Sequence, residues 1–476
     1  MDRSSSLQLT QATRLEDIYK TVSPEPLLTH EELAAFYRDE LNEVRGGDRV
    51  AYIALGLERA WGGAFYKAFL MGHPGVGKST EMTRLAEKIQ DRFRTIRFQV
   101  TKDLDPGSFK PFDILFLMMV RVVESTALQV SDGGAGKAPP DELLQAISDW
   151  FSKEESIRSS GVATAISGAV GIGPPASSLW HKVIGLFATV KGEIKYASDR
   201  STKIVDYRLQ RVSELIDLLN KLLVECNDLL RKATGREWLF IGEEFDKPGI
   251  PAKLTEDLFL SYANVFKGLQ GHLIFNIPIG LVYSEKATQL PFANDRIHII
   301  PDTPVYDREH RPCKEGREAL SDILDARVAP DLFAKAQKIR LIVASGGNLR
   351  DLFTLVGQSA DNSMLNGKGK GKIHKADADR AIVNLRTQYE RSLGESPFDA
   401  TRVTYPEKAA RLVKIYEQDQ DAKVPDPVLY SLLNGRSVQE FNGERWFGVH
   451  PLVVDILKAQ GKLTASAGRT VPGGTE

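Results

Sequence analysis

One stretch decides the fold of this chain, and it reads Gly72-His73-Pro74-Gly75-Val76-Gly77-Lys78-Ser79-Thr80. It matches the phosphate-binding pattern GxxxxGK[ST] in full. The apolar run AFYKAFLMG, which ends at the first glycine, predicts a short buried strand. The next run, KSTEMTRLAEKIQDRF, places Met82, Leu85, Ile89 and Phe93 on one face of a helix. A glycine-rich turn between a strand and a helix predicts a loop whose backbone N–H groups hold phosphates.

Each residue type in this loop has a physical reason. The glycines let the backbone curl, so that successive N–H groups point inward and the helix N-terminus adds its dipole. We expect Lys78 to reach the β- and γ-phosphates and to face solvent until a nucleotide arrives, and the Ser79 hydroxyl to ligate Mg²⁺. All nine loop residues are predicted to bind nucleotide, although His73, at a variable position, is interpreted as incidental.

Hydrolysis needs a second element, which is a carboxylate at a strand end beside the loop. The run Trp238-Leu239-Phe240-Ile241-Gly242-Glu243-Glu244 is an apolar strand that ends in two acids, and Asp246 follows. Adjacent carboxylates at such an end are costly unless a cation or a water network compensates them. We assign Glu243 to the Mg²⁺ shell and Glu244 to orienting the attacking water. The alternative is a pair of exposed acids that begin a loop, but together with the phosphate-binding loop they predict a nucleoside triphosphatase.

Further short apolar runs near 95–100, 237–242, 271–281 and 296–300 predict four more strands. Strands that alternate with helices predict an α/β fold, namely a P-loop parallel five-stranded sheet with helices on both faces. An α-helical lid and a C-terminal winged-helix-like domain are predicted to follow. The predicted divisions are a helical arm at 1–60, the ATPase core at 61–309, the lid at 310–398, the winged-helix-like domain at 399–463 and a disordered tail at 464–476.

The segment 130–203 is predicted to be a flexible insertion. It contains a stretch without charge at 159–180 and a possible hairpin around VKGEIKYA. The helix predicted at about 202–233 has apolar residues spaced alternately three and four apart, which fits either a coiled-coil seam or a core helix. The short length of the repeat, three heptads, favours the core helix.

The C-terminal segment resembles a winged helix because Asn442-Gly443 between two alternating apolar runs predicts a tight hairpin. Residues 401–476 contain ten Lys/Arg and nine Asp/Glu, and the helix PDPVLYSLLNG offers no basic side chain to a DNA groove. This composition favours a protein-contact or lid-locking role over DNA binding. The lysines of NGKGKGKIHK at 366–375 fit either a contact with nucleic-acid backbone or a solvated loop.

The composition of the chain limits the classes of protein to which it can belong. The chain has 476 residues, with 62 Lys+Arg against 63 Asp+Glu and a net charge of -1, which argues against a dedicated polyanion-coating protein but is compatible with a local basic face. Two cysteines supply neither a disulfide framework nor a thiolate metal site. The N-terminus lacks the apolar core of a signal peptide, and the uncharged stretch carries paired prolines that would break a spanning helix. We expect a cytoplasmic protein without membrane contact.

Because it has both the phosphate-binding loop and the apolar strand that ends in Glu243 and Glu244, the chain resembles AAA+ P-loop ATPases of the initiator and STAND-like branch. The resemblance extends over about residues 43–395. The resemblance implies ATP as ligand, Mg²⁺ as cofactor and roles for four further residues. Asn276 in LIFNIP looks like sensor 1, and Arg350 in GNLR looks like sensor 2 at the start of a lid helix. Arg296 is similar in position to the arginine finger, with Arg327 as the alternative. One departure is Glu243, where the family usually has Asp.

The resemblance also implies a nucleotide-dependent switch that assembles into homo-oligomers, with a separate effector protein in bacterial antiphage defence. Two alternatives remain open at this point. One is an ATP-dependent DNA loader or remodeler of the initiator type. The other is a scaffold that binds nucleotide without hydrolysing it.

Overall fold

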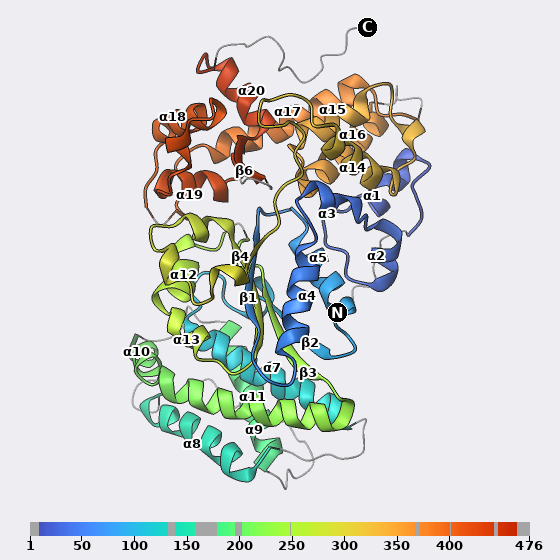
Figure 1. The fold of residues 1–476 in the computed structure, drawn as a ribbon. Coiled ribbons are helices and arrows are strands. Elements are labelled where there is room, and N and C mark those ends of the chain that lie inside the picture. Colours follow the sequence, from blue (N-terminus) through green and yellow to red (C-terminus); the bar gives the residue numbers. More distant parts are fainter. Residues whose placement is uncertain are drawn as a thin grey trace.

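The fold is a five-stranded parallel sheet covered by helices on both faces, which confirms the predicted class (Figure 1). It is seen in a computed structural model that describes residues 9–131, 139–158, 179–195, 202–247, 249–366, 371–399, 401–441 and 446–463. The strands are β1 (Lys67–Gly72), β2 (Phe93–Gln99), β3 (Glu237–Glu243), β4 (His272–Pro278) and β5 (Ile297–Ile299). Their order is β2-β3-β4-β1-β5, so β4 lies between the two strands that carry the predicted motifs. All carboxyl ends therefore meet at one edge.

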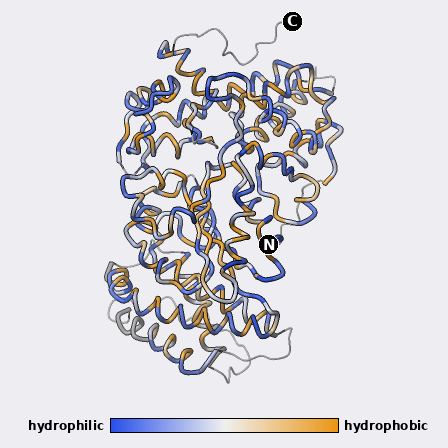
Figure 2. Tube along the Cα trace, in the orientation of Figure 1, coloured by the Kyte–Doolittle hydropathy of each residue, from blue (hydrophilic) through white to orange (hydrophobic). Residues whose placement is uncertain are grey.

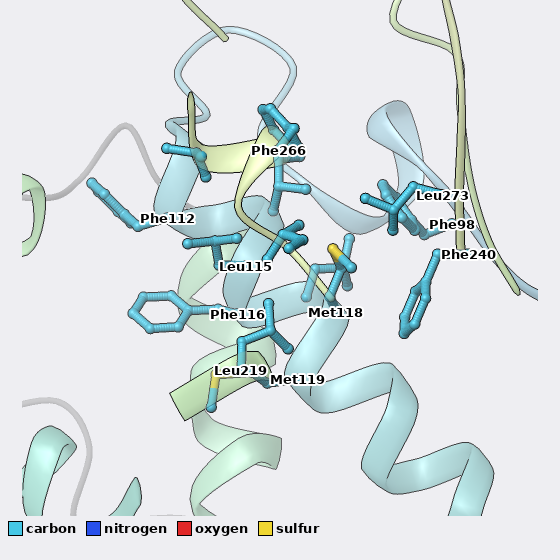
Figure 3. Close-up of a cluster of buried hydrophobic side chains, with 14 of the residues drawn as sticks. Phe98, Phe112, Leu115, Phe116, Met118, Met119, Leu219, Phe240, Phe266 and Leu273 are labelled. Carbon is cyan, nitrogen blue, oxygen red and sulfur yellow. The ribbon is translucent and has the colours of Figure 1, made fainter. Parts of the chain in front are cut away.

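Alternating side chains give the sheet two apolar faces. Ala68 and Leu70 point to one cluster with α4 (Arg49–Ala60) and α5 (Lys78–Lys88). Phe69 and Met71 point to a larger cluster with α7 (Pro111–Ser131) and α11 (Val212–Thr234). In Figure 3, Phe98 and Phe240 of the sheet and Phe112, Leu115, Phe116 and Met118 of α7 contribute to this larger cluster. The helix α11 packs on α7 and β3, so the core-helix interpretation is confirmed.

The segment predicted as a flexible insertion is helical in its described parts, whereas 132–138, 159–178 and 196–201 lie outside the described residues. Its helices are α8 (Asp141–Arg158), α9 (Leu179–Lys195) and α10 (Thr202–Gln210). The proposed hairpin VKGEIKYA begins within α9, where Val183, Phe187, Val190 and Ile194 are buried at helical spacing. The helical spacing of these buried residues decides the structure of the segment, because only a helix brings all four to one face. The long helix expected at about 202–233 is broken at Arg211.

A second core joins the lid, the C-terminal segment and the N-terminal arm. In Figure 1 this part lies at the opposite end of the molecule from α8 and α9, and Figure 2 shows apolar residues running through it. The lid helices are α14 (Lys314–Asp325), α15 (Gln337–Ala344), α16 (Leu349–Leu365) and α17 (Lys375–Ser392). The C-terminal elements are α18 (Tyr405–Tyr416), α19 (Pro427–Asn434), β6 (Val438–Phe441), β7 (Trp446–Val449) and α20 (Pro451–Ala459). The segments predicted as lid and winged-helix-like domain thus share one core.

The N-terminal arm contains α1 (Ile18–Thr21), α2 (His30–Phe36) and α3 (Glu40–Val44), and a capping box of Thr29 and Glu32 begins α2. Shorter elements include α6 (Val100–Asp103), α12 (Ala252–Glu256), α13 (Ala263–Lys267) and the 3-10 turn η4 (Ile279–Tyr283).

The strands β6 and β7 pair antiparallel as predicted, although the turn Asn442-Gly443 lies outside the described residues, as do 367–370 of the lysine-rich loop and the tail 464–476. Among the helices that the structure describes, none has the length and apolarity needed to cross a membrane.

Truncating a side chain of α8 tests whether the insertion belongs to the core. Phe151 is buried against Phe116, Trp150 and Phe187. Phe151→Ala should lower the free energy of unfolding by about 3–5 kcal/mol, the usual loss for a buried phenylalanine. Urea unfolding measures this, with Leu128→Ala on the exposed side of α7 as control, expected within about 0.5 kcal/mol of wild type. Equal stabilities for the two variants would mean that α8 does not pack on the core.

Candidate functional site

The phosphate-binding loop lies at the carboxyl edge of the sheet, as predicted. β1 ends at Gly72 and α5 begins at Lys78, so the loop's N–H groups and the N-terminus of α5 share one location. Gly75 and Gly77 have φ of +90° and +106°, which L side chains rarely adopt. A Cβ at Gly75 would lie 2.5 Å from Asn348 Oδ1, so this glycine also allows the lid to approach the loop.

A cavity of about 510 Å³ opens in front of the loop. It is lined by the loop, the N-terminal arm, the segment after β3 and the start of α16. The predicted site residues among its lining are Pro74, Gly75, Val76, Gly77, Lys78, Ser79, Thr80, Glu244, Asn276, Arg327 and Arg350. Gly72, His73, Glu243 and Arg296 are not among the lining residues. A cavity of this size lies within the range of small-molecule sites.

Lys78 is buried and not solvent-facing, which corrects the prediction. Its side chain is 5% exposed, and its Nζ lies 2.7 Å from Gly72 O, 2.9 Å from His73 O and 2.6 Å from Asp246 Oδ2. An ammonium group has three N–H donors, so all three are used. Burial lowers the pKa of Lys78, and the Asp246 carboxylate opposes that change.

Glu243 is held by Arg97 of β2. Arg97 Nη2 lies 2.6 Å from Glu243 Oε1, and the same guanidinium donates to Thr83 Oγ1 at 3.0 Å and to Ser79 O at 3.3 Å. The Glu243 side chain is fully buried, and its Oε2 has no hydrogen-bond partner among the described residues. Burial raises the pKa of Glu243 despite the neighbouring guanidinium. Arg97 thus joins the helix of the phosphate-binding loop to β3.

Glu244 and Asn276 face the cavity from neighbouring strand ends. Glu244 accepts a hydrogen bond from the Thr101 hydroxyl and pairs with Lys247 Nζ at 3.3 Å. Glu244 has a φ of +72°, which is strained for a residue with a Cβ. This conformation changes the direction of the backbone directly after β3. Asn276 is 2% exposed, and its Oδ1 has no partner among the described residues. As expected from the resemblance, Asn276 lies on the strand between β1 and β3.

The lid meets the loop through the first turn of α16. The Arg350 N–H donates to Gly75 O at 3.2 Å, and Asn348 Nδ2 donates to Pro74 O at 3.1 Å. Asn348 also caps α16 by accepting from the Asp351 N–H. The Arg350 side chain lines the cavity, and its charge contributes to lowering the pKa of Lys78. The structure therefore brings the predicted sensor 2 residue to the phosphate-binding loop.

The two arginine-finger candidates lie in different places. The Arg327 guanidinium lies over the rings of Phe36 and Phe353, at 4.5 Å and 4.8 Å from their centroids, and lines the cavity. Burial lowers the pKa of Arg327 to about 9. Arg296 precedes β5 at the amino edge of the sheet, away from the loop of its own chain, and lies over Tyr66. Arg296 is 39% exposed, so a second copy of the chain can reach it.

His73 is not incidental, and this corrects the interpretation. The ring is fully buried, with Nδ1 3.1 Å from Leu433 O and Nε2 accepting from the Glu440 N–H at 3.2 Å. These bonds require the neutral ring, and burial lowers the pKa of His73. A variable position of the loop thus contacts the end of α19 and β6.

A buried polar network extends this contact. Asp302, which follows β5, accepts from Asn348 Nδ2 at 3.0 Å and from Gln439 Nε2 at 2.8 Å. Gln439 also donates to Gly346 O at 3.0 Å. The loop, the start of the lid helix and the C-terminal hairpin are therefore connected by hydrogen bonds without an intervening apolar layer.

Sequence reasoning missed the partners of the motif residues. Asp246 follows the acidic pair by two positions, but no pattern in the sequence pairs it with Lys78. Arg97 carried a weak signal, since a charged residue interrupts the apolar strand TIRFQV. Thr80 accepts from the Leu27 N–H at 3.1 Å, a contact between residues 53 positions apart that no local pattern predicts.

Comparisons with known proteins give only distant similarity. No family model matches the chain, and no curated protein matches it in sequence. Among solved structures, the Orc1 protein of Aeropyrum pernix in complex with DNA is 11% identical, with a TM-score of 0.36 and coverage of 95% of this chain and 98% of that one. The Walker-type ATPase paby2304 of Pyrococcus abyssi is 13% identical, with a TM-score of 0.37 and coverage of 92% and 99%. Drosophila ORC bound to DNA is 9% identical, with a TM-score of 0.33 and coverage of 97% and 93%. These values are too low to assign a function.

The histidine next to this network predicts a pH dependence of stability. His450 stacks on Tyr389, and its ring bonds the Ser345 carbonyl and the Leu452 N–H. Burial lowers its pKa from 6.5 to about 4. Between these values the unfolded chain binds a proton that the folded chain excludes, so stability falls as pH falls, by up to about 1.4 kcal/mol per pH unit.

His450→Asn should make this fall shallower, because asparagine does not titrate. Urea unfolding at pH 7, 6 and 5 measures the free energy of unfolding of the variant and of the wild type. The contribution of carboxylate titration is common to both proteins and cancels in the difference. His30→Asn, at a solvent-exposed position, is the matched control. Parallel curves for wild type and His450→Asn would show that this histidine does not titrate as the buried ring requires.

Proposed function

We propose that this chain is an ATP-dependent molecular switch of the AAA+ type that binds and hydrolyses ATP and assembles into homo-oligomers. The observation that carries the proposal is the phosphate-binding loop at the carboxyl edge of the sheet, with Lys78, Glu244 and Arg350 around one cavity. Backbone N–H groups, a helix N-terminus and two cations are what a triphosphate requires.

The chemistry assigned to each residue follows from its place. Lys78 and Arg350 bind phosphate oxygens, and Glu244 orients the attacking water together with Asn276. The donor set at the cavity also fits Mg²⁺, because Ser79 and the acids after β3 supply oxygen ligands. Mg²⁺ at nucleotide sites is usually held by one or two carboxylates together with the phosphates of the substrate. When bound, Mg²⁺ would neutralise phosphate charge.

The hydrogen bonds of His73 provide the route by which nucleotide binding changes the C-terminal segment. A phosphate that binds Lys78 draws the ammonium toward the cavity and so weakens its bonds to the carbonyls of Gly72 and His73, which changes the shape of the loop. Because the His73 ring holds Leu433 O and the Glu440 N–H, this change reaches α19 and β6. Nucleotide state is thereby turned into an altered C-terminal surface.

This geometry supports a protein-contact role for the C-terminal segment. α19, which corresponds to the predicted helix PDPVLYSLLNG, buries Leu429, Leu432 and Leu433 and packs on η4. We therefore favour the switch over a DNA loader. The separate effector and the role in antiphage defence are hypotheses that come from the sequence resemblance alone.

Lys78→Ala should abolish tight ATP binding, because the loop then lacks its phosphate-binding cation. It should also lower the free energy of unfolding by about 3 kcal/mol, since Asp246 is left as a buried, unpaired carboxylate. Calorimetric titration with ATP and urea unfolding measure the two effects.

The matched control is the double variant Lys78→Ala/Asp246→Asn, which removes both charges. It should recover most of the stability and still not bind ATP, which separates lost binding from lost folding. Wild-type ATP affinity in either variant would contradict the assignment of the site.

Mixing two variants tests assembly. Arg296→Ala should bind ATP but not hydrolyse it, because the arginine that neutralises the γ-phosphate comes from a neighbouring copy. Glu244→Gln should also bind without turnover, and mixing the two should partly restore phosphate release, since some interfaces then pair an intact acid with an intact arginine. Arg350→Ala, which removes a cation of the chain's own cavity, should bind ATP more weakly and gain nothing from mixing. Turnover that is independent of protein concentration, without rescue at any ratio, would contradict this arrangement.

A further inference from the structure

Two acids at the end of β3, Glu243 and Asp246, differ in what they face. Glu243, which the sequence pattern assigns to the metal, is fully buried, bonded to Arg97 and absent from the cavity lining. Asp246 lines the cavity and lies 2.6 Å from Lys78 Nζ. Both acids are paired with a cation, but only Asp246 reaches the cavity in which a nucleotide and its metal would bind.

The donor count of Lys78 makes Asp246 the group that must move. Two acceptors of the ammonium are backbone carbonyls of the loop, and the third is the Asp246 carboxylate. A phosphate oxygen can bind Lys78 only when an acceptor leaves, and Asp246 is the acceptor that carries negative charge. Asp246 therefore competes with phosphate for the same cation.

We propose that Asp246 is the metal-binding acid of the nucleotide site. On binding of Mg²⁺ and ATP, its carboxylate gives up Lys78 to a phosphate and becomes a ligand of the cation together with the Ser79 hydroxyl. The displaced carboxylate would repel the phosphates if no cation lay between them. Asp246 thus opposes ATP when the metal is absent and supports ATP when the metal is present. This inference rests on the proposed nucleotide-binding function.

Calorimetric titration with ATP in EDTA and in Mg²⁺ tests the inference on wild type, Asp246→Asn and Glu243→Gln. Wild type should gain about tenfold or more in affinity from Mg²⁺. Asp246→Asn should bind ATP in EDTA about tenfold more tightly than wild type, because the competing charge is gone, and should gain less than about twofold from Mg²⁺. Glu243→Gln, which changes an acid of the same strand end, should keep the wild-type gain.

The opposite pattern overturns the inference, namely a lost Mg²⁺ gain in Glu243→Gln and a retained one in Asp246→Asn. If Asp246→Asn does not fold, Asp246→Glu keeps the charge and moves the carboxylate by one methylene. Its Mg²⁺ gain should fall at least about threefold while that of Glu243→Asp stays unchanged, and the reverse again overturns the inference. Lys78→Ala distinguishes a failure of the proposed nucleotide-binding function from a failure of the role proposed for Asp246. Wild-type affinity in Lys78→Ala defeats the proposed function, whereas lost binding there with wild-type behaviour of Asp246→Asn defeats only the role of Asp246.

Discussion

The coordination of one ammonium group organises the site. Lys78 is bonded to two carbonyls of its own loop and to Asp246, in a place that water scarcely reaches. A buried charge requires such partners, and each partner fixes another part of the chain. Asp246 fixes the segment after β3, and the carbonyls of Gly72 and His73 fix the curl of the loop. Any ligand that takes Lys78 must rearrange these contacts.

His73 extends that constraint beyond the loop. Its carbonyl bonds Lys78, while its ring bonds α19 and β6. One residue therefore joins the phosphate-binding cation to the C-terminal hairpin. Asp302 adds a second connection, because it bonds the residue that caps the lid helix and a residue of β6. Lid and hairpin are thus coupled to the loop through short, buried hydrogen bonds.

The sequence predicted what depends on local pattern. All five strands of the sheet and the loop follow from period, glycine spacing and motif, whereas the assignments of Asn276 and Arg350 come from the resemblance. It did not predict what depends on tertiary packing. The ring of His73, the pair of Lys78 with Asp246 and the bond of Arg97 to Glu243 join distant or non-periodic positions, on which local propensity has no influence. The prediction of a hairpin around VKGEIKYA was wrong. A short alternation of apolar and polar residues also fits a helix, and the buried residues of α9 recur every three or four positions.

The most direct test of the coupling is hydrogen exchange at the backbone amide of Glu440, whose N–H bonds the His73 ring. The measurement compares the wild-type chain with and without ATP, at a concentration that saturates the site. Binding of phosphate to Lys78 should weaken this bond, so exchange at Glu440 should become at least about tenfold faster, while the amides of β3 keep their protection. Unchanged protection at Glu440 in the ATP-bound chain would contradict the claim that the loop controls the C-terminal hairpin.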